Sequence, residues 1–363
     1  MTGHQSPDDI LDEYSRHIGR RFLFLAALAV AVAVLFLVSV TVGTRGLSVA
    51  EVFGLLIDHL SGVTYDRATE YGLWFDDNIV WNYRVPRAIF AIVAGAALAV
   101  AGAAMQSVMK NPLADPYTTG ISSGALLGVA MAMVLGFAVG GSGVDGFGIT
   151  LNALLFSMVP VLVIVVLGPY INGSPSTLIL AGTAVSYLFN SLTSILMVIT
   201  DQATMATVYR WQVGHLGDLT WDSIPLVLSV TVVGTLVLLA LSNKLNVMSL
   251  DDRDARALGL DGEGLRMTCL VLLSFMAATV IGYAGVIGFV GLVVPHMVRM
   301  VIGSDNRFVI PGSVLFGAAF LLGCDIVSRA MDVSELIPVG VVTAFVGAPV
   351  FLYLIVRNRR GVW

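Results

Sequence analysis

The sequence predicts an all-α polytopic membrane protein with about ten transmembrane helices and both termini in the cytoplasm. Its 363 residues are 57% hydrophobic and only 12% charged, with a mean hydropathy of +0.90, whereas soluble domains are roughly 25% charged. The apolar residues gather in runs long enough to cross a bilayer, and the basic residues divide unequally between the connecting segments. Together these observations exclude an ordinary soluble enzyme and a disulfide-rich secreted scaffold.

Ten runs have the length of a membrane span, which is about 20 mostly apolar residues. Only glycine-rich sequence separates the seventh run from the eighth, so this boundary is the weakest, and merging the two runs would remove one crossing. The expected spans are Phe22–Val42, Pro86–Val108, Ile121–Val139, Thr150–Leu167, Ser176–Thr200, Ile224–Leu241, Leu265–Tyr283, Val286–Ile302, Val309–Met331 and Pro338–Val356.

The flanking segments define the expected domain organisation. A polar segment, 1–21, precedes the first run and lacks the short basic start and cleavage site of a signal peptide, so the first span is expected to be retained. One ten-helix transmembrane domain, 22–357, follows, with a short tail at 358–363. Within the domain, 43–82 is expected outside the cytoplasm and contains an amphipathic stretch too short to span, whereas 243–264 is a charged loop inside.

The distribution of lysine and arginine sets the expected orientation. With the N-terminus in the cytoplasm, thirteen of the nineteen basic residues fall inside, and the even number of spans returns the C-terminus to the same side. The six basic residues left outside are Arg45, Arg67, Arg84, Arg87, Arg210 and Arg329.

Small residues fill several spans, most densely at 95–104, where the sequence is GAALAVAGAA, and at four glycines spaced by three between 282 and 291. Such residues let helix backbones approach closely where lipid supplies no hydrophobic drive between helices. We therefore expect tight helix packing, with sliding motion between helices as the alternative role.

The sequence contains few groups suited to covalent chemistry or to binding a cofactor. Neither of its lysines, Lys110 and Lys244, belongs to a phosphate-binding loop, so this chain is not expected to bind ATP by that route. The five histidines are scattered, and the cysteines Cys269 and Cys324 lie in apolar runs, so neither a metal site nor a disulfide is expected. The net charge of −5 argues against a nucleic-acid partner. We expect neither enzymatic activity nor a cofactor in this chain.

Asp325 is the one ionisable group placed near the middle of an expected span. Intramembrane carboxylates often serve ion pathways, so an ion-coupled secondary transporter that uses Asp325 is the alternative function. If Asp325 does not take part in an ion pathway, we expect it to be a structural partner for backbone or hydroxyl groups.

Two long stretches, Trp81–Val129 and Gly282–Phe351, carry the motifs RVPR, GAALAVAGAAMQ, NPLADP, GFVGLVVPH and PVGVVTAFVGAPVF. With them the chain closely resembles the FecCD-type permease subunits of ATP-driven importers for iron-siderophore complexes, haem and cobalamin. The resemblance implies ten spans, a location in the cell membrane and transport by alternating access. It also implies a homodimer or paired paralogues, two ATPase subunits that bind ATP and Mg, an extracytoplasmic substrate-binding protein, and a metal chelate as substrate. A ferric siderophore is the first expectation, with haem or cobalamin as the others.

The resemblance also assigns roles to two groups of residues. In similar permeases, arginines matching Arg84, Arg87 and Arg329 pair with glutamates of the binding protein; the alternatives are snorkelling to the interface or internal pairing with Asp76, Asp77, Asp332 or Glu335. The loop 243–264 resembles the segment that couples the permease to the ATPase. It would place four residues in a groove of the ATPase, unless it is simply a solvated loop: Ala255, Arg256, Leu258 and Gly259.

A polar stripe on the fifth span is the candidate translocation pathway. Its residues recur at steps of four and three, which aligns them on one face of a helix. Similar permeases line a central channel with this span, whereas hydrogen bonding within the bundle is the competing interpretation. The stripe consists of Thr183, Tyr187, Asn190, Ser194 and Met197, and the turn 172–177 would lie at its inner mouth.

Overall fold

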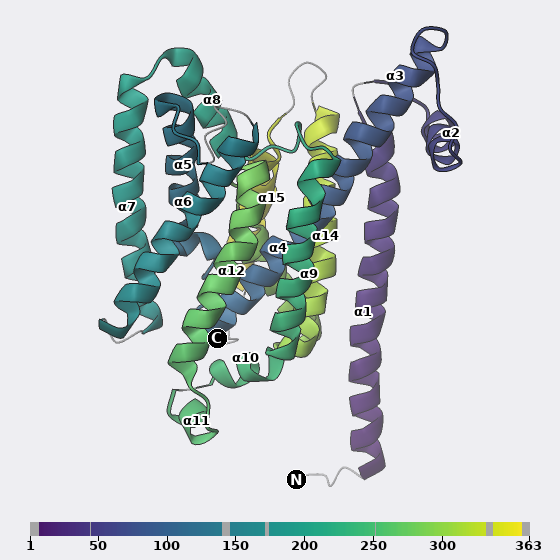
Figure 1. The fold of residues 1–363 in the computed structure, drawn as a ribbon. Helices are drawn as coiled ribbons and strands as arrows, with labels where there is room; N and C mark the ends of the chain where they lie inside the picture. Colours follow the sequence, from purple (N-terminus) through teal and green to yellow (C-terminus); the bar gives the residue numbers. More distant parts are fainter. Residues whose placement is uncertain are drawn as a thin grey trace.

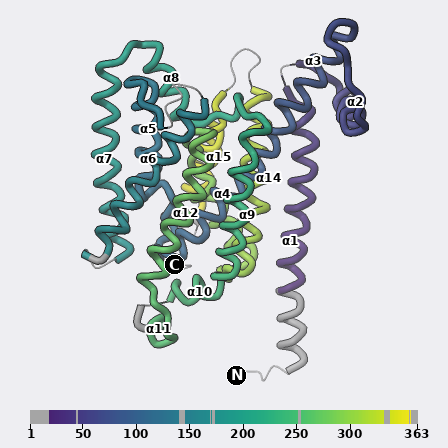
Figure 2. The backbone as a smooth tube through the Cα atoms, in the orientation of Figure 1, coloured from purple at the N-terminus to yellow at the C-terminus, as the bar shows by residue number. Residues whose placement is uncertain are grey.

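The computed structural model describes residues 7–43, 45–139, 146–170, 174–250, 252–331 and 337–357, and these ranges contain helices and no strand. Figures 1 and 2 show a bundle of long, roughly aligned helices. In chain order the helices are α1 (Pro7–Thr41), α2 (Val49–Leu60), α3 (Tyr71–Ile79), α4 (Val85–Val108), α5 (Ile121–Leu135), α6 (Gly146–Leu167), α7 (Pro175–Ile199), α8 (Gln202–Gln212), α9 (Ile224–Ala240), α10 (Ser242–Met248), α11 (Asp252–Ala257), α12 (Gly262–Ala284), α13 (Val290–Ile302), α14 (Asn306–Met331) and α15 (Val339–Arg357). Four short segments complete the list: a π-helical η1 (Val80–Arg84) and the 3₁₀ turns η2 (Pro116–Thr119), η3 (Gly168–Tyr170) and η4 (Trp221–Ser223).

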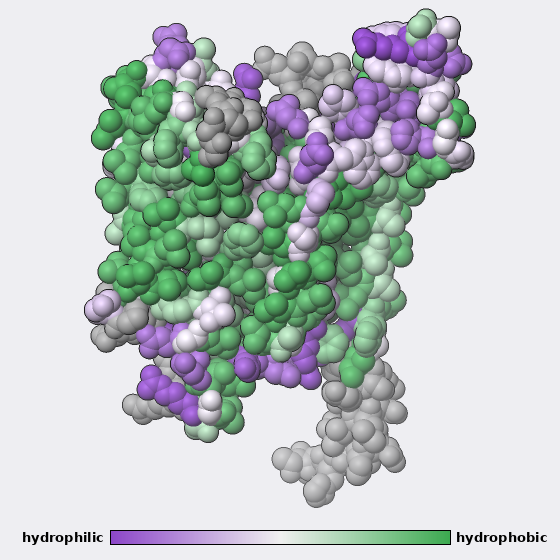
Figure 3. All heavy atoms as spheres, in the orientation of Figure 1, coloured by the Kyte–Doolittle hydropathy of each residue, from purple (hydrophilic) through white to green (hydrophobic). Residues whose placement is uncertain are grey.

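The expected number of spans agrees with the structure. In the described ranges seven helices are long and apolar enough to cross a membrane, and three shorter apolar helices, Ile121–Leu135, Val290–Ile302 and Val339–Leu354, coincide with the remaining expected spans. Figure 3 shows the corresponding surface, an apolar belt between two more polar ends. The all-α polytopic fold class is therefore confirmed.

The two ends of the bundle carry different elements. One end holds α10 and α11 together with the start of α1, and the other holds α2, α3 and α8 (Figure 1). The basic-residue bias predicts that the α10–α11 end faces the cytoplasm, so we call it the inner end and the opposite one the outer end. The outer helix α2 matches the expected amphipathic stretch and begins with a capping box, in which Ser48 and Glu51 each bond to the other's backbone N–H.

The second span begins earlier than the sequence indicated. Pro86 is a favourable first residue of a helix, and the span was expected to start there, but the helical run extends from Tyr71 to Val108. The π-helical turn η1, Val80–Arg84, ends two residues before this proline. A proline inside a helix removes one backbone hydrogen bond and crowds the preceding turn, and the wider π turn accommodates it.

Helix α4 runs through the middle of the bundle and is buried along almost its whole length. A Cβ atom on Gly95 would lie 2.2 Å from the carbonyl oxygen of Gly317 on α14, and one on Gly102 would lie 1.9 Å from that of Gly291 on α13. Backbones this close require glycine at both contacts. The small residues of the second span therefore serve tight helix packing, as the sequence indicated.

The weakest expected boundary, between the seventh and eighth spans, is a genuine break in the helix. Helix α12 ends at Ala284 and α13 begins at Val290. Gly285 has φ of +71°, and its missing side chain leaves room for the carbonyl oxygen of Trp211, which would lie 2.1 Å from a Cβ. The two runs are separate elements, so no crossing is lost.

Candidate functional site

A buried cluster of charged side chains joins α4 and α14 near the outer end. Asp325 on α14 has an exposed fraction of 0%, and its Oδ1 accepts a hydrogen bond of 2.8 Å from Nε of Arg87 on α4. Its Oδ2 lies 2.8 Å from Nη2 of Arg329, one helical turn further along α14. One carboxylate thus bridges two arginines, which compensates part of the free-energy cost of burying their charges.

The same cluster is tied to the end of α1 through backbone carbonyl groups. Arg329 donates to the carbonyl oxygen of Ser39 at 2.9 Å and to the hydroxyl of Ser39 at 2.6 Å. Arg84 donates to the carbonyl oxygens of Thr41 at 3.0 Å and Arg45 at 2.7 Å. All three arginines are buried, so they lock α1, α4 and α14 together at this end.

The internal partners of these arginines differ from those expected from the sequence. The internal partners considered were Asp76, Asp77, Asp332 and Glu335. Arg87 and Arg329 instead pair with Asp325. Asp76 pairs with Arg45, and Asp77 with His59. Asp332 and Glu335 lie outside the described residues. Asp325, expected to bond backbone or hydroxyl groups if structural, instead pairs with guanidinium groups. The i,i+4 spacing of Asp325 and Arg329 was a visible signal for one of these pairs.

The cluster carries three positive charges and one negative charge in its named residues, so it has an excess of positive charge. The structure brings the three predicted docking arginines together, but it directs their guanidinium groups to internal acceptors. Docking of a partner's carboxylates on them remains a prediction.

Helix α7, which carries the predicted pathway stripe, packs mainly against α5, α6 and η2. The stripe therefore lies on a helix at the side of the bundle (Figure 1). Four of its members are exposed, with Tyr187 at 72%. Met197 is buried and departs from the stripe. The hydroxyls of Thr183 and Ser194 bond carbonyl oxygens of their own helix, Ile179 and Asn190, so they do not need a partner helix.

The predicted coupling residues lie at the extreme inner end (Figure 1). This segment contains the short helix α11, and Gly259, with φ of +76°, follows it in the left-handed region that favours glycine. Arg256 and Leu258 are exposed, Leu258 at 65%, whereas Ala255 is buried. Three of the four predicted residues, Arg256, Leu258 and Gly259, are thus exposed, whereas Ala255 packs inside the bundle.

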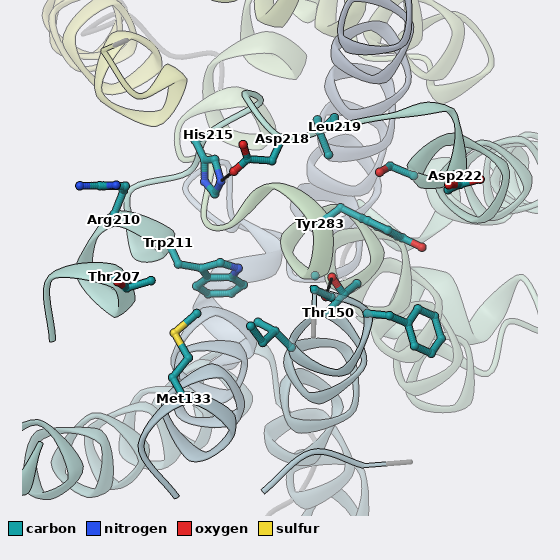
Figure 4. A pocket seen from close by; sticks show the side chains of 15 residues that line it. Met133, Thr150, Thr207, Arg210, Trp211, His215, Asp218, Leu219, Asp222 and Tyr283 are labelled. Atoms are coloured by element: carbon teal, nitrogen blue, oxygen red, sulfur yellow. Dashed lines mark hydrogen bonds and ion pairs between the residues drawn. The ribbon is translucent and has the colours of Figure 1, made fainter. Parts of the chain in front are cut away.

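An outer cavity of about 600 Å³ opens between α5, α6, α8 and α12. Figure 4 shows the side chains of Trp211 and Tyr283 in this cavity, with the His215–Asp218 pair, 3.2 Å apart, at its edge. Backbone bonds from His215 to Ala284 and from Gly340 to Gly214 tie this loop to the end of α12 and the start of α15. Within the described ranges no three histidine, cysteine or acidic residues gather as metal ligands would.

Comparison with known proteins shows which family this chain belongs to. The profile of the FecCD transport family matches residues 31–357. A protein of Methanocaldococcus jannaschii assigned as an ABC transporter permease is 33% identical over 98% of this chain and 100% of its own length. The hemin transport system permease protein HmuU of Yersinia pestis is 35% identical over 82% of this chain and 87% of its own. The cobalamin import system permease protein BtuC of Halobacterium salinarum is 38% identical over 78% of this chain and 74% of its own.

A solved structure supports the same assignment at the level of the fold. It is described as an inward-facing conformation of a transporter assigned to the metal-chelate ABC type, and it covers 92% of this chain and 98% of its own with a TM-score of 0.78 and 28% identity. The match therefore includes nearly the whole bundle. The chain belongs to the FecCD transport family and is a multi-pass membrane permease of the ABC transporter type.

Proposed function

We propose that this chain is the permease subunit of an ATP-driven importer that depends on a substrate-binding protein and moves a ferric siderophore into the cytoplasm by alternating access. The observation that carries the proposal is the similarity, over most of the chain, to permeases named for hemin and cobalamin import. Haem and cobalamin are accordingly the other candidate substrates. A molybdate import permease, MolB of Haemophilus influenzae, is 30% identical over 93% of this chain, so molybdate belongs in any substrate test.

ATP hydrolysis belongs, in this proposal, to two separate ATPase subunits, with ATP and Mg bound there. The proposed contacts with them are the exposed side chains of Arg256, in the last turn of α11, and Leu258, which follows it. Because α11 packs against α10 and α12, a force applied there reaches the long helix α12 directly.

A second copy of the permease is the proposed neighbour of α7. The hydroxyls of Thr183 and Ser194 are satisfied within α7, but the exposed polar groups of Tyr187 and Asn190 are unfavourable against lipid. A partner copy or a water-filled channel between two copies would relieve this cost. Thr183, Tyr187, Asn190 and Ser194 would then line the pathway, with Met197 supporting the helix from its buried side.

The outer arginine cluster is the proposed docking region for the binding protein. Its excess positive charge attracts carboxylates, and guanidinium groups form bidentate pairs with them. Docking on Arg84, Arg87 and Arg329 themselves would require these side chains to exchange internal acceptors for external ones.

The test is ATP-dependent uptake into proteoliposomes that contain this chain, its ATPase and its binding protein, with a ferric siderophore, haem, cobalamin and molybdate compared in parallel. An ATPase variant unable to hydrolyse ATP is the control. Uptake of one chelate that stops with the inactive ATPase supports the proposal and names the substrate. Uptake that continues without the ATPase and collapses with an ionophore would instead establish the ion-coupled alternative. The two ion pairs of Asp325 favour a structural role over ion carriage.

A further inference from the structure

A second cavity, of about 430 Å³, lies at the inner end between α4, α13 and the start of α14, beside the segment that follows α10. Basic and neutral polar side chains dominate its lining, and none of the lining residues is acidic in the part of the chain that the structure describes. The lining consists of Gln106, Ser107, Lys110, Asn111, Pro112, Ser249, His296, Arg299, Met300, Ser304 and Asn306. A cavity lined in this way is suited to an anion.

Arg299 supplies the deepest positive charge of this lining. Its guanidinium group donates to the side-chain oxygen of Gln106, to the carbonyl oxygen of Ala103 at 2.9 Å and to the hydroxyl of Ser107 at 3.5 Å. These acceptors are all neutral. They satisfy hydrogen bonds but leave the charge uncompensated, which is unfavourable for a cation removed from water.

Asp305, which lies between the lining residues Ser304 and Asn306 in the sequence, is already engaged elsewhere. Asp305 accepts hydrogen bonds from Arg307, at 2.6 Å and 2.9 Å, and from the side chain of Asn246 at 2.8 Å. Its charge is therefore paired with the exposed Arg307 at the start of α14, and its other hydrogen bond comes from α10. Since no acidic residue lines the cavity in the described part of the chain, an anion from outside could supply a negative charge there.

The location of the cavity indicates where such an anion comes from. Met300, in its lining, is 44% exposed and Val301 beside it is 61% exposed, so apolar side chains suited to contact with lipid are exposed next to the basic pocket. Lys110, also in the lining, is exposed and donates to the carbonyl oxygen of Leu250 at 2.6 Å. Basic pockets between helices at the cytoplasmic surface attract phosphate headgroups of anionic lipids.

We propose that the cavity between α4, α13 and α14 is a binding site for a phosphate-type oxyanion, supplied by the headgroup of an anionic phospholipid of the inner leaflet. Arg299 and His296 would face the phosphate from α13 and Lys110 from the loop after α4. The site adjoins Ser249, next to α10 and the coupling segment. Its occupation would therefore stabilise the inner ends of α4, α13 and α14 relative to one another.

The experiment measures thermal unfolding of the purified, delipidated full chain in detergent, titrated with a short-chain phosphatidylglycerol. Parallel titrations use phosphatidylcholine with the same acyl chains and inorganic phosphate, which separates a lipid headgroup from free phosphate. The main variant is Lys110→Gln, because Lys110 is exposed and its loss spares the buried contacts of Arg299. Lys244→Gln is the matched control: Lys244, the other lysine of the chain, is exposed on α10 at the same inner end and does not line the cavity.

Phosphatidylglycerol is expected to raise the unfolding temperature more than phosphatidylcholine does. Lys110→Gln is expected to weaken its apparent affinity about fivefold, the effect of about 1 kcal/mol for one basic residue near a charged headgroup, whereas Lys244→Gln leaves it unchanged. If inorganic phosphate alone stabilises the protein, and Lys110→Gln weakens this effect, the cavity binds an oxyanion as proposed. The bound anion would then be a soluble one and not a lipid headgroup. Equal effects of the two lipids, or equal losses in the two variants, would overturn the proposal. Because the purified permease suffices, the outcome does not depend on the transported substrate.

Discussion

Asp325 and Arg87 are 238 positions apart in the sequence, and Nε of Arg87 donates a hydrogen bond of 2.8 Å to Oδ1 of Asp325. This contact joins α4 to α14 at the outer end, while Gly95 and Gly317 bring the same two helices into backbone contact further along. Charge pairing and close packing thus act on one helix pair.

Replacing Asp325 with asparagine is expected to lower the free energy of unfolding by about 3–5 kcal/mol, because it leaves the buried Arg87 and Arg329 without a counter-charge. SDS-induced unfolding in mixed micelles measures the change. Asp218→Asn, at an acidic residue whose side chain is 92% exposed at the same end, is the control and should unfold as the parent does. Equal stability of the two variants would show that the buried pairs contribute nothing.

The close approach of α4 and α14 predicts that Gly95→Val destabilises the bundle. A side chain there would meet the carbonyl oxygen of Gly317 at 2.2 Å, so the helices must separate, at a cost of about 1–3 kcal/mol or more. Gly323→Ala on α14, where no atom lies within 4 Å of the added carbon, is the matched control. The yield and unfolding temperature of detergent-solubilised protein report the difference, and similar values for both variants would contradict the packing argument.

Coupling to the ATPase is expected to depend on Arg256 and Leu258. The double variant Arg256→Ala with Leu258→Ala should keep the fold, because both side chains are exposed, and should lower transport-coupled ATP hydrolysis about fivefold or more, a typical size for coupling between sites. The measurement is substrate-stimulated ATP hydrolysis by the reconstituted complex. Glu263→Ala, also exposed, serves as the control. Unchanged hydrolysis in the double variant would assign this segment to a solvated loop.

Asn246 connects the coupling segment to α14. Its Nδ2 donates to Asp305 at 2.8 Å and its Oδ1 accepts from the backbone N–H of Asn306 at 2.8 Å. Asn246→Ala is expected to lower the free energy of unfolding by about 1–2 kcal/mol, because it leaves these partners unsatisfied. Asn243→Ala, exposed on the same helix α10, should have little effect in the same unfolding assay. If the two variants lose equal stability, Asn246 does not act through α14.

A pH dependence follows from Asp305, which lies outside the spans. Hydrogen bonds from Arg307 and Asn246 lower the pKa of its carboxyl group to about 2, below the value of about 3.9 expected when unfolded. A depressed pKa stabilises the folded state above pH 4, and this contribution is lost as the pH falls from about 4 towards 2. The unfolding temperature of Asp305→Asn should therefore fall less than that of the parent protein between pH 5 and pH 3. A parallel decline of both proteins would show that other groups carry the acid sensitivity.

The number and order of the spans, the all-helical class and the amphipathic outer stretch that forms α2 could be predicted from the sequence alone. These features depend on local information, because apolar runs and amphipathic periodicity act over neighbouring positions. The resemblance to FecCD permeases rested on motifs of the same local kind and was confirmed by the family match.

Which side chains meet depends on the tertiary fold. Asp325 receives Arg87 from a distant helix, Arg84 uses carbonyl oxygens at the end of α1, and Arg299 takes neutral acceptors from α4. The π turn before Pro86 and the exposed face of α7 likewise depend on how whole helices pack. Such contacts join residues tens to hundreds of positions apart, and their energies depend on burial and distance, neither of which a linear pattern contains.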